Sequence, residues 1–287
     1  QLLDRLSSNE GNLLDDVELL GVLSNTKTKA IEVKTKLVQA TQTKLDINEK
    51  RETFRPVATR GSVLYFSIVE TSNLNVMYQT SLAQFLELFM DSMDKSEKAN
   101  LASKRVDNII YTMTYIVYRY INRGLYEADK LTFVLIVTLK ILVVAKRLDQ
   151  GDVGLLLRGG AALDINSVRK KPFQWMPDQT WLNIIELSTR VGFFRSLPED
   201  LVRNEAPWKV WFESNMPEVE EVPDFESRLV EEPKMGAWFR LLIIRTFRLD
   251  RAQLCIKSFI KEQPAMGQRY VEPVTDTLPS IYEGMIP

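Results

Sequence analysis

The amino-acid sequence predicts an all-α protein built around a long antiparallel helical hairpin. Apolar residues recur with three- and four-residue spacing over long stretches, as helices require. Most of the chain lacks the alternating apolar and polar pattern of a half-buried strand, and no internal repeat is evident. The most apolar run, residues 131–145, is shorter than the ~20 residues that span a bilayer and contains Lys140, so it predicts a buried helix.

The first expected element is a helix from about Leu20 to Thr53. Its apolar positions follow the heptad spacing of a coiled-coil seam, and most other positions are Lys, Thr, Glu, Gln or Asp. A single narrow stripe does not stabilise an isolated helix, so this helix needs a partner. At 1.5 Å per residue it would be roughly 50 Å long, which suits a strut better than a globular core. The predicted seam residues are Ala30, Val33, Leu37, Ala40, Ile47 and Phe54.

A break in the helical pattern follows, in the stretch RETFRPVATRGSVLYF at residues 51–66. Pro56 fixes its own φ and disfavours helix at Arg55, and Gly61 weakens the next turn. These signals predict the hairpin turn near residues 53–61.

The sequence after this turn, residues 62–93, is again helical in length and predicts the second arm of the hairpin. A gentler kink, with the partner helix supplied from elsewhere, is the alternative to a hairpin. The residues expected at the turn, where a neighbouring element could be contacted, are Arg51, Arg55, Pro56, Arg60 and Gly61.

The rest of the chain predicts helices separated by loops. Residues 100–147 contain two helical patterns, the second of them apolar nearly all round. A further helix is expected over residues 178–194, and a final pair of helices over residues 234–263. Residues 151–179 are rich in loop signals, and frequent prolines with the acidic run PEVEEVPDFE predict an extended surface loop over residues 197–233.

Composition removes several kinds of chemistry. The 287 residues include no histidine and one cysteine, and the net charge is −1. Histidine bases, Ser-His and Cys-His pairs and histidine metal ligands are therefore excluded, and one cysteine cannot complete a structural zinc site. The near-neutral charge argues against nucleic acid as the main partner. The single cysteine predicts a reducing compartment, and the start lacks the features of a signal peptide.

Local motifs do not supply a catalytic or metal site. The glycine pair in RGGA, residues 158–161, lacks the lysine and the spacing of a phosphate-binding loop, so it predicts a turn. The acidic pairs Asp15-Asp16 and Glu220-Glu221 lack the alternating ligands of a calcium loop, and they predict a helix N-terminus and a surface loop.

Arginines are concentrated in the stretch RLLIIRTFRLDR. They could contact a nucleotide bound by a neighbouring domain, or they could form ion pairs that fix one domain against the next. Domain positioning is the preferred interpretation, and its residues are Arg245, Arg248 and Arg251.

Several segments, taken in order, resemble dynein heavy chains. They are GNLLDD, RETFRPVATRGSVLYF, MYQTSLAQFLELF, RGLYEADKLTF, GGAALDI, PFQWMPDQTWLN, and LLIIR followed by DR. The resemblance covers nearly the whole chain and is to the part of the motor ring that follows the large subdomain of the fifth AAA+ module. The residues of two segments, NVMYQTSLAQFLELF and GGAALDI, resemble those of axonemal heavy chains, an outer-arm type above all.

This resemblance implies a mechanical role. In dyneins the small helical subdomain of the fifth module carries an antiparallel coiled-coil hairpin, the buttress or strut, which props the microtubule-binding stalk. Residues 1–19 would end the preceding subdomain, residues 20–95 would form the hairpin, and residues 96–287 would form the small subdomain and the connector to the sixth module. The segment would relay ring motion to the stalk of an ATP-driven, minus-end-directed microtubule motor in the axoneme of cilia and flagella.

The resemblance also implies that chemistry lies elsewhere in the parent protein. The fifth and sixth modules do not hydrolyse ATP in this family, so ATP or ADP with Mg would occupy other modules and this segment would not be an enzyme. Its partners would be neighbouring modules and the stalk, with the microtubule and the intermediate and light chains reached through the parent, and no nucleic acid or membrane. Leu249 stands where the family commonly has proline, so that turn would differ.

A second interpretation needs no motor. The chain would then be a self-contained helical scaffold without catalytic activity, whose hairpin recruits partners.

Overall fold

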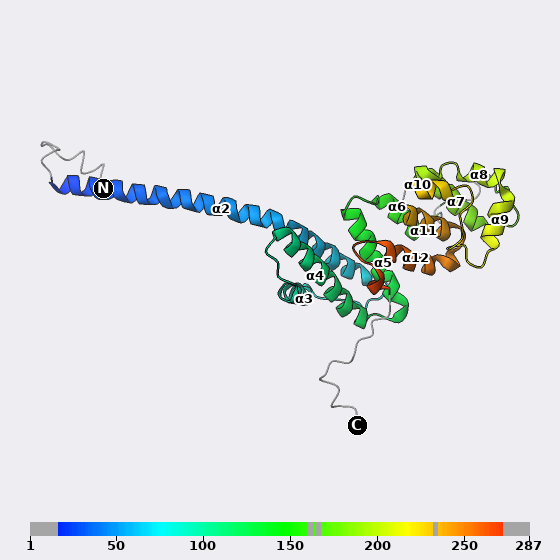
Figure 1. The fold of residues 1–287 in the computed structure, drawn as a ribbon, viewed down its shortest axis with the longest axis horizontal. Helices are drawn as coiled ribbons and strands as arrows, with labels where there is room; N and C mark the ends of the chain where they lie inside the picture. The colour runs from blue at the N-terminus through cyan, green and yellow to red at the C-terminus, as the bar shows by residue number, and fades with distance from the viewer. Residues whose placement is uncertain (1–16, 160–162, 165–167, 232–234, 272–287) are drawn as a thin grey trace, which may run out of the picture.

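The computed structural model describes residues 17–159, 163–164, 168–231 and 235–271, and within these ranges it contains helices and no strand. This confirms the predicted all-α class. One helix, α2, projects far beyond the rest of the molecule (Figure 1). The other helices form two groups, which we call the root bundle, where α2 ends, and the distal lobe.

The root bundle contains α3 (Leu82–Lys95), α4 (Ala102–Gly124) and α5 (Glu127–Val144) around the last turns of α2. The distal lobe contains α6 (Gln150–Arg158), α7 (Asp178–Arg190), α8 (Leu197–Arg203), α9 (Glu205–Glu213), α10 (Glu226–Glu231) and α11 (Gly236–Phe247). Helix α12 (Ala252–Glu262) packs against both α11 and α5 and so joins the two groups.

Helix α2 spans Val17–Thr71 without a break, a length of 55 residues. The predicted hairpin turn over residues 53–61 is therefore wrong. Pro56 lies inside the helix, where it removes one backbone hydrogen bond. The helix continues because the turns that follow are held by packing, with Leu64 and Ile68 each 1% exposed. At 1.5 Å per residue α2 is about 80 Å long.

The chain turns back after Thr71. The Thr71 and Ser72 hydroxyls donate to backbone carbonyls within the last turn of α2, which competes with further helical bonding. Ser81 then caps the start of α3, because its Oγ accepts a hydrogen bond from the Gln84 N–H at 3.1 Å. Polar side chains, rather than proline and glycine, mark this reversal.

Gly61 serves close packing between α2 and α3. A side-chain carbon on Gly61 would lie only 3.0 Å from Cε2 of Phe89, so the absence of one lets α3 approach. The Tyr65 and Phe85 rings lie 5.3 Å apart, and the two contacts together make α3 antiparallel to the end of α2. The second arm predicted over residues 62–93 is therefore divided among the end of α2, a turn and the short α3.

The pair of helices predicted over residues 100–147 is confirmed as α4 and α5. Both pack against the end of α2, and α5 is buried around much of its circumference, as its composition predicts. Phe133 and Val134, neighbours in sequence, are 1% and 2% exposed. Among the described helices, none combines the length and the apolar character that a membrane crossing requires.

The distal lobe is more helical than predicted. The surface loop expected over residues 197–233 is wrong, because α8, α9 and α10 lie in it and bury Trp208, Trp211 and Phe225. The Trp208 ring stacks on Phe247 of α11 at a centroid distance of 5.3 Å. Pro198 and Pro207 lie in the first turns of α8 and α9, where a missing N–H costs nothing.

The other expectations for this half are largely met. The helix expected over residues 178–194 is α7, and the final pair of helices is α11 and α12. The segment 151–179 begins with α6, so it is less irregular than its glycines suggest. Helix α11 forms the centre of the lobe, with Leu241, Ile243 and Ile244 fully buried.

Candidate functional site: the exposed arm and its root

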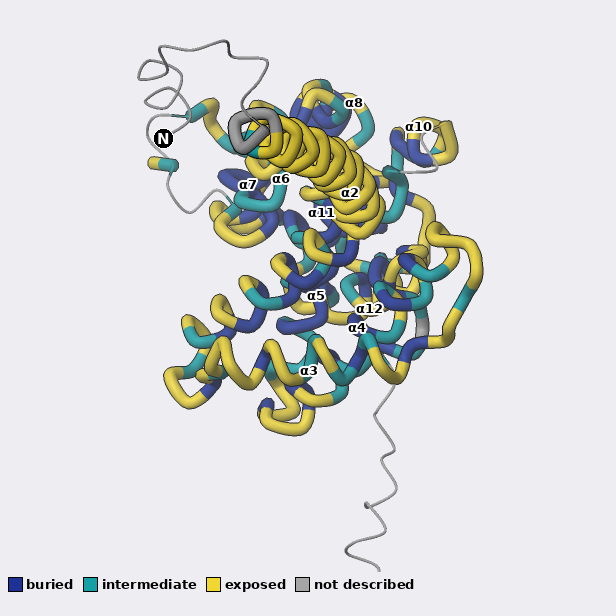
Figure 2. The backbone as a smooth tube through the Cα atoms, turned by 90° about the vertical axis from the view of Figure 1, so that its left-hand side faces the viewer, coloured by how far each residue is buried: buried dark blue, intermediate teal, exposed yellow. Residues whose placement is uncertain are grey.

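We call residues 21–55 of α2 the arm and residues 56–71 the root. Almost every arm residue is exposed, whereas one side of the root is buried in the bundle (Figure 2). The predicted seam lies on the arm, and its side chains are exposed: Val33 by 65%, Leu37 by 66% and Ile47 by 53%. Within the described residues no second helix covers this seam. Its role as a coiled-coil seam therefore stays a prediction.

A second apolar row on the arm was missed in the sequence. It consists of Ile31, Val38 and Leu45, which are 57%, 62% and 58% exposed. Ile31 and Val38 each follow a seam residue, so the row lies about 100° further around the helix. Its signal was available, because the three residues recur every seven positions at a second place in the heptad. Two apolar rows give the arm two sides on which another helix can pack.

The polar surface of the arm is basic, and ion pairs within the helix link some of its charged side chains. Residues 21–55 include eight Lys or Arg and four Asp or Glu, although the whole chain carries a net charge of −1. Ion pairs join Lys36 to Glu32 at 2.6 Å and Arg55 to Glu52 at 2.7 Å. Because both pairs are exposed to water, each contributes little to the stability of the helix. The arm therefore favours acidic over basic neighbours.

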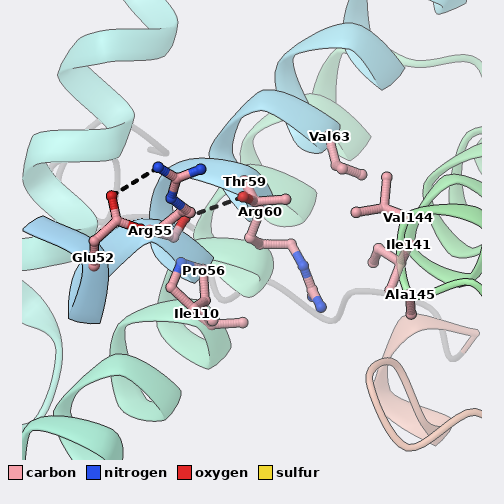
Figure 3. Close-up of a pocket in the computed structure, with 10 residues that line it drawn as sticks. All are labelled: Glu52, Arg55, Pro56, Thr59, Arg60, Val63, Ile110, Ile141, Val144 and Ala145. Atoms are coloured by element: carbon pink, nitrogen blue, oxygen red, sulfur yellow. Dashed lines mark hydrogen bonds and ion pairs between the residues drawn. The ribbon is translucent and has the colours of Figure 1, made fainter.

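The residues predicted for the turn lie instead where the arm enters the bundle. Arg51, Arg55 and Pro56 are exposed, Arg60 is half-buried and Gly61 is buried. At this junction a groove of about 360 Å³ lies between α2, α4 and α5 (Figure 3). Its lining residues are Glu52, Arg55, Pro56, Thr59, Arg60, Val63, Ile110, Ile141, Val144 and Ala145.

Arg60 has few partners in this groove. Its Nη1 lies 3.3 Å from Oγ1 of Thr114, while Arg55 turns the other way to pair with Glu52 (Figure 3). No carboxylate of the described residues forms an ion pair with Arg60. Burial lowers the pKa of Arg60, an effect that the nearby Tyr270 partly opposes.

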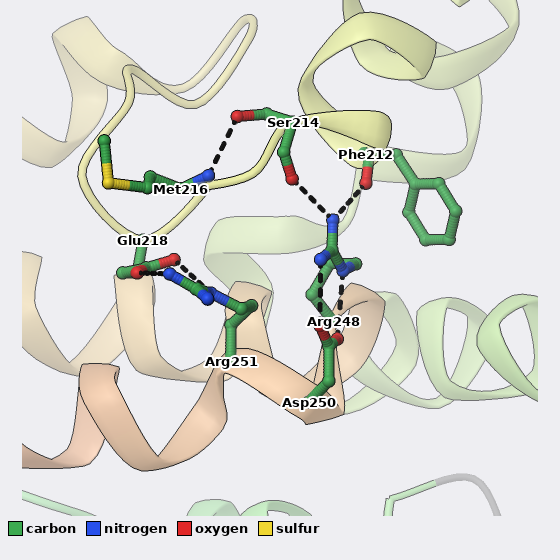
Figure 4. A network of polar contacts seen from close by, with 7 residues as sticks. All are labelled: Phe212, Ser214, Met216, Glu218, Arg248, Asp250 and Arg251. Atoms are coloured by element: carbon green, nitrogen blue, oxygen red, sulfur yellow. Dashed lines mark hydrogen bonds and ion pairs between the residues drawn. The ribbon is translucent and has the colours of Figure 1, made fainter.

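Two of the three arginines predicted to position domains, Arg248 and Arg251, hold together one side of the distal lobe (Figure 4). Arg251 pairs with Glu218. Arg248 binds Asp250 through two nitrogens and donates to the carbonyl oxygens of Phe212 and Ser214 at 2.6 and 2.8 Å. These bonds fix the segment after α9 against the turn between α11 and α12.

Arg245 makes a different contact from the other two. Its Nε donates to the Leu156 carbonyl oxygen at 2.7 Å, which ties α11 to α6. Each of these arginines is thus engaged within the lobe, and positioning against another module stays a prediction.

The ion pairs lower the pKa values of the two carboxylates, Glu218 and Asp250. The hydrogen bond from Arg251 lowers the pKa of Glu218, and the one from Arg248 lowers the pKa of Asp250. Both carboxylates therefore remain charged to lower pH than in an unfolded chain.

The described residues offer little to a chemical reaction. Burial raises the pKa of the Cys255 thiol to about 12, so it stays protonated and unreactive near neutral pH. Within the same ranges, no three His, Cys, Asp or Glu side chains gather where they could hold a metal ion.

Two motifs from the sequence, the acidic pair Asp15-Asp16 and the glycine pair in RGGA, fall partly or wholly outside the described residues. Asp15-Asp16 lies outside them, as does the end of RGGA from residue 160. Gly159 of that motif has φ of 58°, the left-handed conformation expected where a helix ends in a turn.

Comparison with known proteins gives long, continuous similarity. The chain is 48% identical over 274 residues to the dynein gamma chain of the flagellar outer arm of Chlamydomonas reinhardtii, covering 95% of this chain and 6% of that relative. It is 44% identical over 282 residues to human axonemal dynein heavy chain 8, covering 98% and 6%. It is 43% identical over 282 residues to mouse axonemal dynein heavy chain 5, again covering 98% and 6%. No protein-family model matches the chain.

Identity at this level along almost the whole chain makes it a dynein heavy-chain sequence. Within that family it belongs to the axonemal heavy chains, and these relatives include an outer-arm gamma chain. The predicted resemblance is therefore confirmed at the level of the family. The chain spans about 6% of the length of these relatives.

Proposed function

We propose that the chain is the strut of an axonemal dynein motor, located in the small subdomain of the fifth AAA+ module. Its function would be to relay movement of the motor ring to the microtubule-binding stalk. The observation that carries this proposal is the uninterrupted α2, whose arm projects from a packed bundle and exposes two apolar rows. A helix with this much unpaired apolar surface favours packing against other helices.

The proposed relay of movement depends on the packing of the root against the bundle. Because Val57, Leu64 and Ile68 are buried against the bundle, a shift of the bundle moves the root, and the continuous helix carries that motion into the arm. Useful coupling needs two discrete packings of the arm against its neighbours, each favoured by one state of the ring.

The two apolar rows of the arm would each bind a different helix. The seam from Ala30 to Phe54 would take an antiparallel helix that completes the coiled-coil strut, and the row of Ile31, Val38 and Leu45 would face a stalk helix. Sliding of one stalk helix past the other would then change affinity for the microtubule.

Chemistry and remaining partners belong to the parent heavy chain. ATP or ADP with Mg would be bound by other modules of the ring, and the intermediate and light chains would bind elsewhere in the parent. The parent would be a minus-end-directed microtubule motor in the axoneme of cilia or flagella; the axonemal and flagellar location is the part that the names of its relatives support.

The test is a proline in the middle of the arm of the full heavy chain. Leu37→Pro removes a helical hydrogen bond and costs about 3 kcal/mol or more at that point, so the arm bends or breaks. We expect basal ATPase activity to persist and stimulation by microtubules to fall at least tenfold. ATPase rates with and without microtubules give the answer.

Two further variants distinguish the effect of helix stiffness from the effect of the apolar surface of the arm. Leu37→Lys keeps the helix but places a charge in the seam, and it should reduce stimulation in the same direction. Thr35→Ala, exposed on the same arm but in neither apolar row, should leave stimulation within twofold. Normal stimulation of Leu37→Pro would refute the strut role.

A further inference from the structure

The groove at the junction of arm and root contains a cation, Arg60, that forms no ion pair within the part of the chain that the structure describes. Arg60 is half-buried, and among the described residues its guanidinium has the Thr114 hydroxyl at 3.3 Å as its hydrogen-bond acceptor. A guanidinium carries five N–H donors, so most of those of Arg60 have no acceptor among the described residues. Removing a charge from water without pairing it is unfavourable, and a bound anion would relieve that cost.

The walls of the groove add an apolar component. Val63 from α2, Ile110 from α4, and Ile141 and Val144 from α5 line it beside Arg60 (Figure 3). At about 360 Å³ the groove holds several side chains, more than a bare inorganic ion fills. The combination fits an acidic side chain that arrives with apolar neighbours.

The surrounding charge favours the same ligand. Lys146 and Arg147 directly follow Ala145 at the rim and are exposed. Glu52 is the one carboxylate in the lining, and Arg55 already neutralises it. The balance around the opening is therefore positive.

The end of α5 does not oppose an anion here. A helix C-terminus normally presents unpaired carbonyl oxygens, which repel negative charge. In this case the Ala145, Lys146 and Arg147 N–H groups donate to three of the last carbonyls at 2.9 to 3.0 Å. Lys146 makes this closure possible with φ of 55°.

We propose that this groove is a docking site for an Asp- or Glu-bearing segment of a neighbouring protein element, with Arg60 binding the carboxylate and the four apolar residues holding its neighbours. The site stands on the geometry of the groove and does not depend on the strut function. Because the groove sits where Pro56 interrupts the hydrogen bonding of α2, an occupant would also brace the arm against the root.

The experiment uses the 287-residue chain and a labelled peptide. Fluorescence anisotropy measures binding of Leu-Glu-Leu-Leu-amide, labelled with tetramethylrhodamine at its N-terminus, and of the same labelled peptide with Gln in place of Glu. We expect the acidic peptide to bind at least tenfold more tightly. Arg60→Met should weaken its binding at least tenfold, Arg60→Lys should weaken it less, and Arg51→Met, which removes an arginine outside the groove, should change it less than twofold.

Thermal unfolding without peptide provides an independent reading. If Arg60 lacks a partner in the free chain, Arg60→Met should raise Tm by a few degrees, because an uncompensated charge is removed. A lower Tm would mean that Arg60 has a structural partner, and would overturn the proposal. Equal binding of the Glu and Gln peptides, no binding of either, or sulfate binding to Arg60 without peptide binding would overturn it as well.

Discussion

The arm and the root of α2 are continuous in the chain and in the helix, yet they are stabilised in different ways. In the root, Val57, Leu64 and Ile68 are at most 5% exposed and pack against the bundle. In the arm, Val33, Leu37 and Val38 are at least 62% exposed. The root is held as a helix by its neighbours, whereas the arm has only its own local bonds among the described residues.

This contrast explains why strong local signals failed. Pro56 and Gly61 disfavour helix by about 3 and 1 kcal/mol. Burying one Leu or Ile side chain contributes about 1.5–3 kcal/mol, and the root buries several. Tertiary packing therefore outweighs the break that the sequence suggests.

The largest difference in the free energy of unfolding should come from replacing leucine by alanine in each of the two regions. Leu64→Ala leaves a cavity in the root bundle and should lower the free energy of unfolding by about 2–5 kcal/mol. Leu37→Ala is its matched control on the arm and should change it by less than about 0.5 kcal/mol. Urea unfolding of both variants measures the difference. Equal losses would mean that the arm is as tightly packed as the root.

An intermediate effect should come from restoring the hydrogen bond at the junction. Pro56→Ala supplies the missing N–H and should stabilise the helix locally by up to about 3 kcal/mol, or about a hundredfold in local opening. Amide hydrogen exchange of the arm residues next to Pro56 should slow accordingly, while global stability changes less. Unchanged exchange would show that the junction is already fully helical in solution.

The smallest effect should come from a polar contact in the distal lobe. Arg251 holds the pKa of Glu218 below its unfolded value, so the pair stabilises the fold above the unfolded pKa of about 4.3. That contribution disappears as pH falls through the folded pKa. Glu218→Gln should therefore lower stability at pH 7 by at most about 1 kcal/mol and make no difference at the acid end. Urea unfolding at pH 7 and at pH 3 tests this, and an equal loss at both would contradict the ion-pair explanation.

Much of the fold was predictable because its helices have strong patterns. The apolar α5, the amphipathic α7 and the final pair of helices follow from spacing alone. The pattern of the segment with α8, α9 and α10 predicts a loop, because proline is as typical of loops as of helix starts. What distinguished them was burial of Trp208 and Trp211 under α11, which no local window contains.

The candidate site was predictable only in part. Heptad spacing identified the arm and its seam, and the same criterion applied to every position would have found Ile31, Val38 and Leu45. The groove was not predictable, since Arg60, Ile110 and Val144 are brought together by three helices far apart in sequence. Arg60 looked like one more exposed residue of a turn.

The unequal lengths on either side of Pro56 have a mechanical consequence. With the junction as fulcrum, the arm is about 50 Å long and the root about 24 Å, so in the proposed relay the helix would be a lever with a ratio near 2. A tilt of about 10° within the bundle sweeps the far end of the arm through about 9 Å. The same tilt displaces the buried end of the root by about 4 Å, so the far end of the arm would travel roughly twice as far and deliver roughly half the force.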